Sequence, residues 1–135
     1  MKTLTPQLNG VYRMPQRPDQ VRAAAAGIAC TVISLQGIRG RNKLIKVLAK
    51  SLKFPSTFGG NWDALADCLQ DLSWLPERGH VLELAGLADF SAAAPDDLAL
   101  LLEILDASAA YWRQHDRVFV VLIDGVAALP EFPRR

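Results

Sequence analysis

Cysteine, histidine and long apolar runs are all scarce in this sequence of 135 residues. The two cysteines, Cys30 and Cys68, form neither a C-x-x-C motif nor a metal-ligand pattern with the two histidines. We therefore expect both to be reduced, buried as small apolar side chains, and no metal site. Residues 23–33 are the longest nearly apolar run and are too short to span a bilayer, and residues 1–8 lack the apolar segment of a signal peptide. These absences favour a cytoplasmic protein.

Basic and acidic residues are segregated over residues 1–106, although the net charge of the chain is only +1. Residues 1–60 contain ten Lys or Arg and a single acidic residue, Asp19. Residues 61–106 contain ten Asp or Glu and a single basic residue, Arg78, which gives a formal charge of −9. We expect the two segments to present different electrostatic potentials to the solvent.

Length and composition indicate one globular domain. Half of the residues are hydrophobic and 21% are charged, which is ordinary usage for a folded domain. We expect a single domain over residues 1–135. Residues 1–29 form an N-terminal extension in which the pattern suggests an extra strand at 8–14 and a short helix at 18–26.

Strand and helix patterns alternate along the rest of the chain. Strands separated by helices imply right-handed crossovers, so we expect an α/β fold with a small parallel β-sheet of three or four strands packed with helices. Residues 118–123 are apolar without alternation, which is typical of a strand covered on both faces. The predicted strands are 30–35, 80–84 and 118–123, the predicted helices are 42–52, 62–72 and 95–114, and a turn is predicted at 76–79.

The helix predicted at 42–52 has one basic face. Its lysines recur at helical spacing on the side opposite the apolar residues, and Pro55 follows the end of the helix. A basic helix can bind nucleic acid, but this one lacks interleaved aromatic residues and precedes a strongly acidic segment. We therefore favour a solvated face and expect no direct binding of nucleic acid. The lysines are Lys43, Lys46, Lys50 and Lys53.

The acidic segment from Asn61 onward carries the strongest functional signal. Asn61 is a good N-cap residue for a helix, and Asp63, Asp67 and Asp71 then recur at every fourth position. Like charges at this spacing repel each other by roughly a few tenths of a kcal/mol per pair, so the stripe points to a cationic partner. The predicted inward residues are Trp62, Leu65, Leu69 and Leu72, and the outward residues are Asp63, Ala66, Asp67, Gln70 and Asp71.

Catalysis and metal binding explain this stripe less well. On one helix face the Cβ atoms of Asp63 and Asp67 would lie about 6 Å apart, near the separation of some catalytic carboxylate pairs. An outward stripe lacks the burial that raises the pKa of one member, and a straight helix cannot wrap its ligands around a hard cation. We expect no enzymatic activity. His80 and His115 fit structural roles better than catalytic ones, and Trp74 fits either the core or an interface anchor.

One dense run of residues resembles the barstar family of intracellular ribonuclease inhibitors. It consists of Phe54-Pro55 and then Phe58-Gly59-x-Asn61-Trp62-Asp63-Ala64-Leu65-x-Asp67-Cys68-Leu69-x-Asp71-Leu72. With the flanking strands and helices the resemblance extends over residues 30–124. It implies the compact parallel α/β fold of that family, no cofactor, and the activity of an immunity protein that plugs the active site of an extracellular guanyl-specific ribonuclease or a related basic toxin.

The resemblance also implies roles for individual residues. Asp67 would be the central mimic of the phosphate and Asp63 its partner on the same face, because a carboxylate can replace a phosphate among cationic side chains. Thr57, Gly60 and Ala66 depart from the family pattern, where an aromatic, an acidic residue and a tryptophan are expected. The resulting partner-binding set is Thr57, Phe58, Gly59, Gly60, Asn61, Asp63, Ala66, Asp67, Gln70, Asp71, Trp74 and Asp106, the last as an acidic contact from the later helix.

The sequence is also compatible with a second function. The same fold could serve as a non-inhibitory interaction or regulatory domain whose acidic face binds another basic protein. Inhibition of a nuclease separates the two functions.

Overall fold

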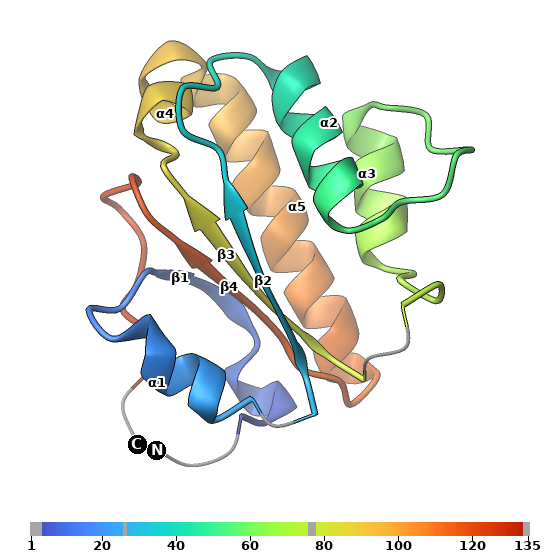
Figure 1. The fold of residues 1–135 in the computed structure, drawn as a ribbon, viewed down its shortest axis with the longest axis vertical. Helices are drawn as coiled ribbons and strands as arrows, with labels where there is room; N and C mark the ends of the chain where they lie inside the picture. Colours follow the sequence, from blue (N-terminus) through green and yellow to red (C-terminus); the bar gives the residue numbers. More distant parts are fainter. Residues whose placement is uncertain (1–3, 26, 76–77, 134–135) are drawn as a thin grey trace.

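A parallel β-sheet with helices on both faces forms the centre of the molecule (Figure 1). This computed structural model describes residues 4–25, 27–75 and 78–133. Within them the sheet has four strands in the order β1-β4-β3-β2, and all neighbouring strands are parallel. The predicted α/β fold is confirmed. The strands are β1 (Gly10–Arg13), β2 (Ala29–Ser34), β3 (His80–Ala85) and β4 (Phe119–Ile123).

The two central strands, β3 and β4, are apolar because both of their faces are covered. All five residues of β4 are buried, as are the first five of β3. The one charged residue among them, Glu83, points toward the face that carries α1 (Pro18–Ala23) and pairs there with Arg22. The continuous apolar run at 118–123 was therefore interpreted correctly.

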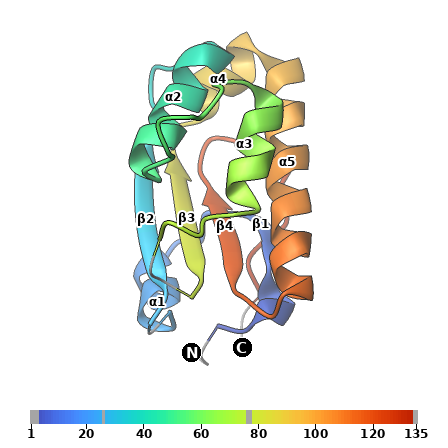
Figure 2. The ribbon, with the colours of Figure 1, turned by 90° about the vertical axis from the view of Figure 1, so that its right-hand side faces the viewer.

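Three helices cover the other face of the sheet (Figure 2). They are α2 (Arg41–Ser51), α3 (Trp62–Leu69) and α5 (Pro95–Gln114), and α3 lies between α2 and α5. Side chains from all three meet the sheet in one core that includes Leu44, Leu65, Leu101 and Phe119. This layer determines which surfaces of α3 remain open to solvent.

The N-terminal segment belongs to the sheet. β1 pairs with β4 from Gly10↔Val120 to Arg13↔Ile123, and a short 3-10 helix, η1 (Pro6–Leu8), precedes it. The buried Asn9 side chain accepts a hydrogen bond from the Phe119 N–H at 2.8 Å and donates to the Arg117 carbonyl at 2.8 Å. The predicted strand and helix of this segment are thus present in shorter form, and Ala26, the last residue of the predicted helix, lies outside the described residues.

Two expectations about local structure were wrong. Cys30 is exposed and Cys68 is half-buried, although both are free as expected. Cys30 lies on the edge strand β2, on the face of the sheet that carries α1. Helix α1 packs against β3 and β4 on this face but leaves Cys30 exposed.

One short helix, α4 (Ala88–Ala93), was not predicted. The predicted turn at 76–79 falls partly on residues 76–77, which are not described.

Candidate functional site

Helix α3 begins at a well-formed N-terminal cap. The Asn61 side chain accepts a hydrogen bond from the Ala64 N–H at 2.8 Å, as its residue type predicted. Gly60 before it has a φ of +74°, in the left-handed region that favours glycine. The cap and this turn together fix the direction in which the helix leaves the loop at 53–61.

The inner side of α3 is held against α5 at both ends. Leu65 and Leu69 are completely buried in the core. At the start of the helix the Trp62 indole N–H donates to the Asp97 carboxylate at 3.4 Å, and at its end the Trp112 indole donates to the Leu69 carbonyl at 2.7 Å. The outer side of α3 is therefore presented on a supported helix.

Two carboxylates, Asp63 and Asp67, are exposed on that outer side, one helical turn apart. The residues beside them, Ala66 and Gln70, are half-buried. Within the described residues, neither carboxylate forms an ion pair. Both are thus available to a cationic partner.

Asp71 does not continue this stripe on the helix, contrary to the prediction. Helix α3 ends at Leu69, and Leu72 adopts a left-handed φ of +51° that turns the chain away from the helix axis and buries its side chain. The exposed Asp71 carboxylate accepts a hydrogen bond from the Ser73 N–H at 3.2 Å, a local bond that competes with continuation of a helix. The acidic surface therefore consists of two helical carboxylates and one in the following turn.

The loop before α3 is supported by an aromatic cluster. Thr57, Gly59 and Gly60 are exposed, whereas Phe58 is half-buried and packs edge-on against Phe54 with ring centroids 5.0 Å apart. Phe54 also packs edge-on against Trp74, whose indole N–H donates to the Leu52 carbonyl at 3.0 Å. Phe58 and Trp74 thus contact the rest of the protein, and the supporting role of Phe54 was not anticipated from the sequence.

Asp106 lies on a different side of α5 from α3. It is nine residues, about two and a half helical turns, beyond Asp97, which faces α3. Burial raises the pKa of Tyr12 on β1, while Arg113 lowers it and Asp106 raises it further, so Asp106 is near β1. Partial desolvation raises the pKa of Asp106 itself. The structure does not bring Asp106 together with Asp63 and Asp67.

Asp97 contacts two other helices, a role that the sequence did not predict. Its carboxylate accepts from Trp62 of α3 and lies 3.8 Å from Arg41 at the start of α2. The sequence marked it only as an acidic residue in the first turn of a helix. Its position at the junction of three helices depends on their packing, which no local pattern reveals.

Helix α2, on one side of α3, presents a basic surface. Lys43, Lys46, Lys50 and Lys53 are all exposed on α2 or just after it, and none of them is in an ion pair with another described residue. A partner seated on α3 would therefore meet the basic surface of α2 on one side.

Among the described residues, no group of three or more His, Cys, Asp or Glu side chains could hold a metal ion. No helix formed by the same residues has the length and apolar character needed to cross a membrane.

The fold and this surface define a small parallel α/β protein with an acidic helix presented on one face. Residues 28–124 match the model of the family described as Barstar (barnase inhibitor). The match covers more than two thirds of the chain, and the protein belongs to this family. Members of the family are non-enzymatic inhibitors. A search of curated proteins finds no match.

Proposed function

We propose that this protein inhibits a basic, barnase-type ribonuclease in the cytoplasm by inserting the outer side of α3 into the nuclease active site. Family membership supports inhibition of such a ribonuclease. The observation that carries the mechanism is the exposure of Asp63 and Asp67, one turn apart, on a helix held at both ends against α5.

Carboxylates suit this task because a ribonuclease site holds phosphate with Arg, Lys and His side chains. A carboxylate accepts charge-assisted hydrogen bonds from the same groups, in a bidentate manner from arginine. Asp67 is exposed on the outer side of α3 and takes the central position, with Asp63 one helical turn away. Because α3 is already formed and supported, little conformational entropy is lost on binding.

The remaining residues form the border of the proposed contact. Thr57, Gly59 and Gly60 lie on the loop at one end of α3, and Asp71 lies in the turn at the other. Ala66 lies on α3 and Gln70 at its C-terminal end, between the loop and the turn. Phe58 and Trp74 support the loop through their contacts with Phe54. Asp106 would be reached only by a partner that extends around α5, and the mechanism does not require it.

Inhibition assays with charge-neutral variants test this function. We expect Asp67→Asn to weaken inhibition of the cognate ribonuclease by at least a few kcal/mol, because cationic groups of the nuclease are left buried without a partner. Asp116→Asn is the matched control, since Asp116 is an exposed aspartate outside α3 whose left-handed φ suits asparagine.

The outcome separates the mechanism from its alternatives. Inhibition by Asp67→Asn equal to that of the unmodified protein would show that α3 is not the inhibitory surface. Tight binding of a basic protein without loss of its nuclease activity would instead support the non-inhibitory interaction domain.

A further inference from the structure

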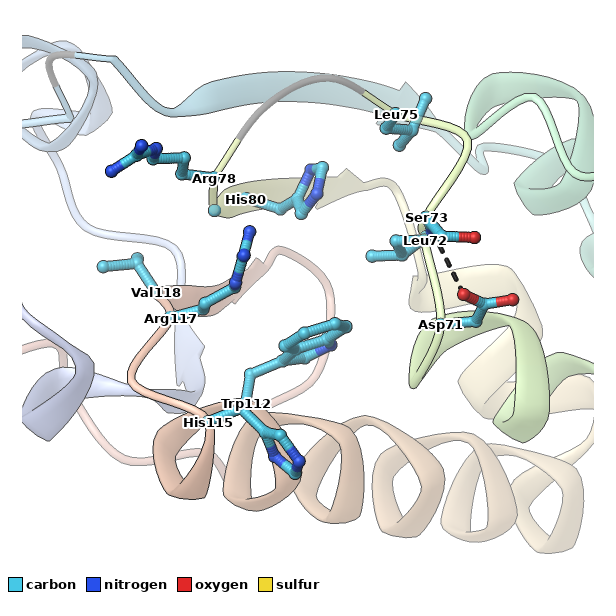
Figure 3. Close-up of a pocket in the computed structure, with 11 residues that line it drawn as sticks. Asp71, Leu72, Ser73, Leu75, Arg78, His80, Trp112, His115, Arg117 and Val118 are labelled. Atoms are coloured by element: carbon cyan, nitrogen blue, oxygen red, sulfur yellow. Dashed lines mark hydrogen bonds between the residues drawn. The ribbon is translucent and has the colours of Figure 1, made fainter.

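A cavity of about 460 Å³ lies apart from the outer side of α3, at the end of the sheet where β3 and β4 begin (Figure 3). Its walls come from four parts of the chain: the turn after α3, the residues that start β3, the end of α5 and the residues that start β4. Such a volume is in the range of small-molecule sites. The lining includes Asp71, Leu72, Arg78, His80, Trp112 and Arg117.

The starts of the two central strands bring two arginines to this cavity. Arg78 and Arg117 each lie two residues before a residue of the same β3–β4 ladder, His80 and Phe119. Gly79 allows the close approach, because a Cβ atom there would lie only 3.0 Å from the Val118 carbonyl oxygen. The parallel register therefore places both basic residues at one edge of the sheet.

Arginines outnumber carboxylates in the described lining of the cavity. That lining includes two arginines and one acidic residue, Asp71. Among the described residues neither arginine is in an ion pair, and the Asp71 carboxylate accepts from the Ser73 N–H. An anionic ligand would find unneutralised guanidinium groups here.

The side chains also differ from one end of the cavity to the other. In Figure 3, Arg117 points toward His80, while Arg78 is turned outward at the same end. The Trp112 indole and Leu72 point into the middle of the cavity, and Asp71 stands at the far end. The bond from Trp112 to the Leu69 carbonyl fixes the ring, so that it offers a ready flat wall.

We propose that this cavity binds a nucleoside monophosphate, with the phosphate at Arg117 and the base against Trp112. A phosphate group is an anion with several acceptor oxygens, and two of them can accept hydrogen bonds from one arginine guanidinium group. A base is a flat ring that packs on an indole, and its exocyclic amino group is a donor for Asp71. The order of cation, ring and carboxylate along the cavity matches the order of phosphate, base and amino group along the ligand.

This site does not depend on the proposed inhibitory function. Arg117 and Trp112 are not on the outer side of α3, and Asp71 is the one residue common to both surfaces. Loss of nucleotide binding would leave the inhibition assay with Asp67→Asn unaffected, so the two proposals fail separately.

Titration of the isotope-labelled full chain, followed by NMR, tests the proposal. The probes are adenosine and guanosine monophosphates, with inorganic phosphate and adenosine alone as comparisons. We expect either nucleotide to shift the Trp112 indole N–H and the Gly79 and Val118 amide signals, and to bind at least about tenfold more tightly than phosphate or adenosine, since each occupies only half of the site.

Variants assign the phosphate end of the site. Arg117→Gln should weaken nucleotide binding about tenfold by removing a charge-assisted contact. Arg117→Lys, which keeps the charge but loses the fork, should weaken it less. Arg39→Gln is the matched control, because Arg39 is an exposed arginine that follows the opposite end of β2.

Three results would overturn the proposal. The first is that neither nucleotide shifts the NMR signals. The second is that inorganic phosphate binds as tightly as the nucleotides. The third is that Arg117→Lys, Arg117→Gln and the unmodified protein bind the nucleotide with equal affinity. Thermal unfolding of each variant shows whether it is folded, and if Arg117→Gln is not, the Arg117→Lys comparison decides.

Discussion

Arg22 of α1 forms a bidentate ion pair with Glu83, whose side chain is only 2% exposed in the central strand β3. The two nitrogen–oxygen distances are 2.6 and 2.7 Å. Glu83 lies within the residues matched by the family model, and Arg22 lies before them. A charge in the middle of the sheet is thus neutralised by a segment outside the matched region.

The first prediction concerns this pair. Arg22→Met should lower the thermal unfolding midpoint, because it leaves the Glu83 carboxylate buried without its partner. The double variant Arg22→Met with Glu83→Met should recover most of the loss, since an apolar pair replaces the ion pair. Arg17→Met, which removes an exposed pair with Asp19, is the control and should change the midpoint little.

The second prediction concerns the cap of α3. Asn61→Ala should destabilise the protein by about 1 kcal/mol, because the Ala64 N–H loses its acceptor. Asn61→Asp keeps an acceptor at that position and should retain the stability. Denaturant unfolding measures both effects, and equal stability of the alanine and aspartate variants would contradict the role of the cap.

The third prediction concerns the thiol on α3. Burial and the nearby carboxylates of Asp71 and Asp67 raise the pKa of Cys68. A raised pKa leaves less thiolate at neutral pH, so alkylation should be slow and should accelerate at a higher pH than for an ordinary cysteine.

Charge removal tests the cause of that shift. In a Cys30→Ser background, Asp71→Asn should lower the pKa of Cys68 and move the pH profile of alkylation to lower pH. Asp89→Asn, a change outside α3 and its turn, should leave the profile in place. An unchanged profile for Asp71→Asn would mean that the carboxylate does not act on the thiol.

The fourth prediction concerns the lysines of α2. If α3 binds a basic nuclease, Lys46 and Lys50 repel that partner during approach. Replacing both with glutamine should increase the association rate at low salt, and added salt should reduce the difference. Stopped-flow mixing measures the rates. A decrease in the association rate would indicate instead that the partner carries an acidic patch opposite α2.

Features that depend on local pattern were largely predictable from the sequence. The apolar run at 118–123, the cap at Asn61 and the helix from Pro95 follow from periodicity and end signals that operate within a few residues. The parallel sheet follows from the alternation of strands and helices. The short helix α4 was not predicted because its six residues, three of them alanine, are too few to show a helical period.

Features that depend on packing were not predictable in the same way. Cys30 is exposed because β2 is an edge strand, and strand order is not encoded in β2 itself. Asp71 leaves the helix because the chain must turn at Leu72 to reach β3. Asp106 faces away from α3 because only the docking of α5 decides which of its sides meets that helix.

The pairing of β1 with β4 has a consequence for the timing of folding. Gly10 pairs with Val120, so β1 finds its neighbour only after β4, far later in the sequence, has emerged from the ribosome. Contacts so distant in sequence slow folding and leave intermediates exposed. A nascent chain that stops before residue 119 has β1 without its partner strand, so the sheet that supports α3 is incomplete until β4 has been synthesised.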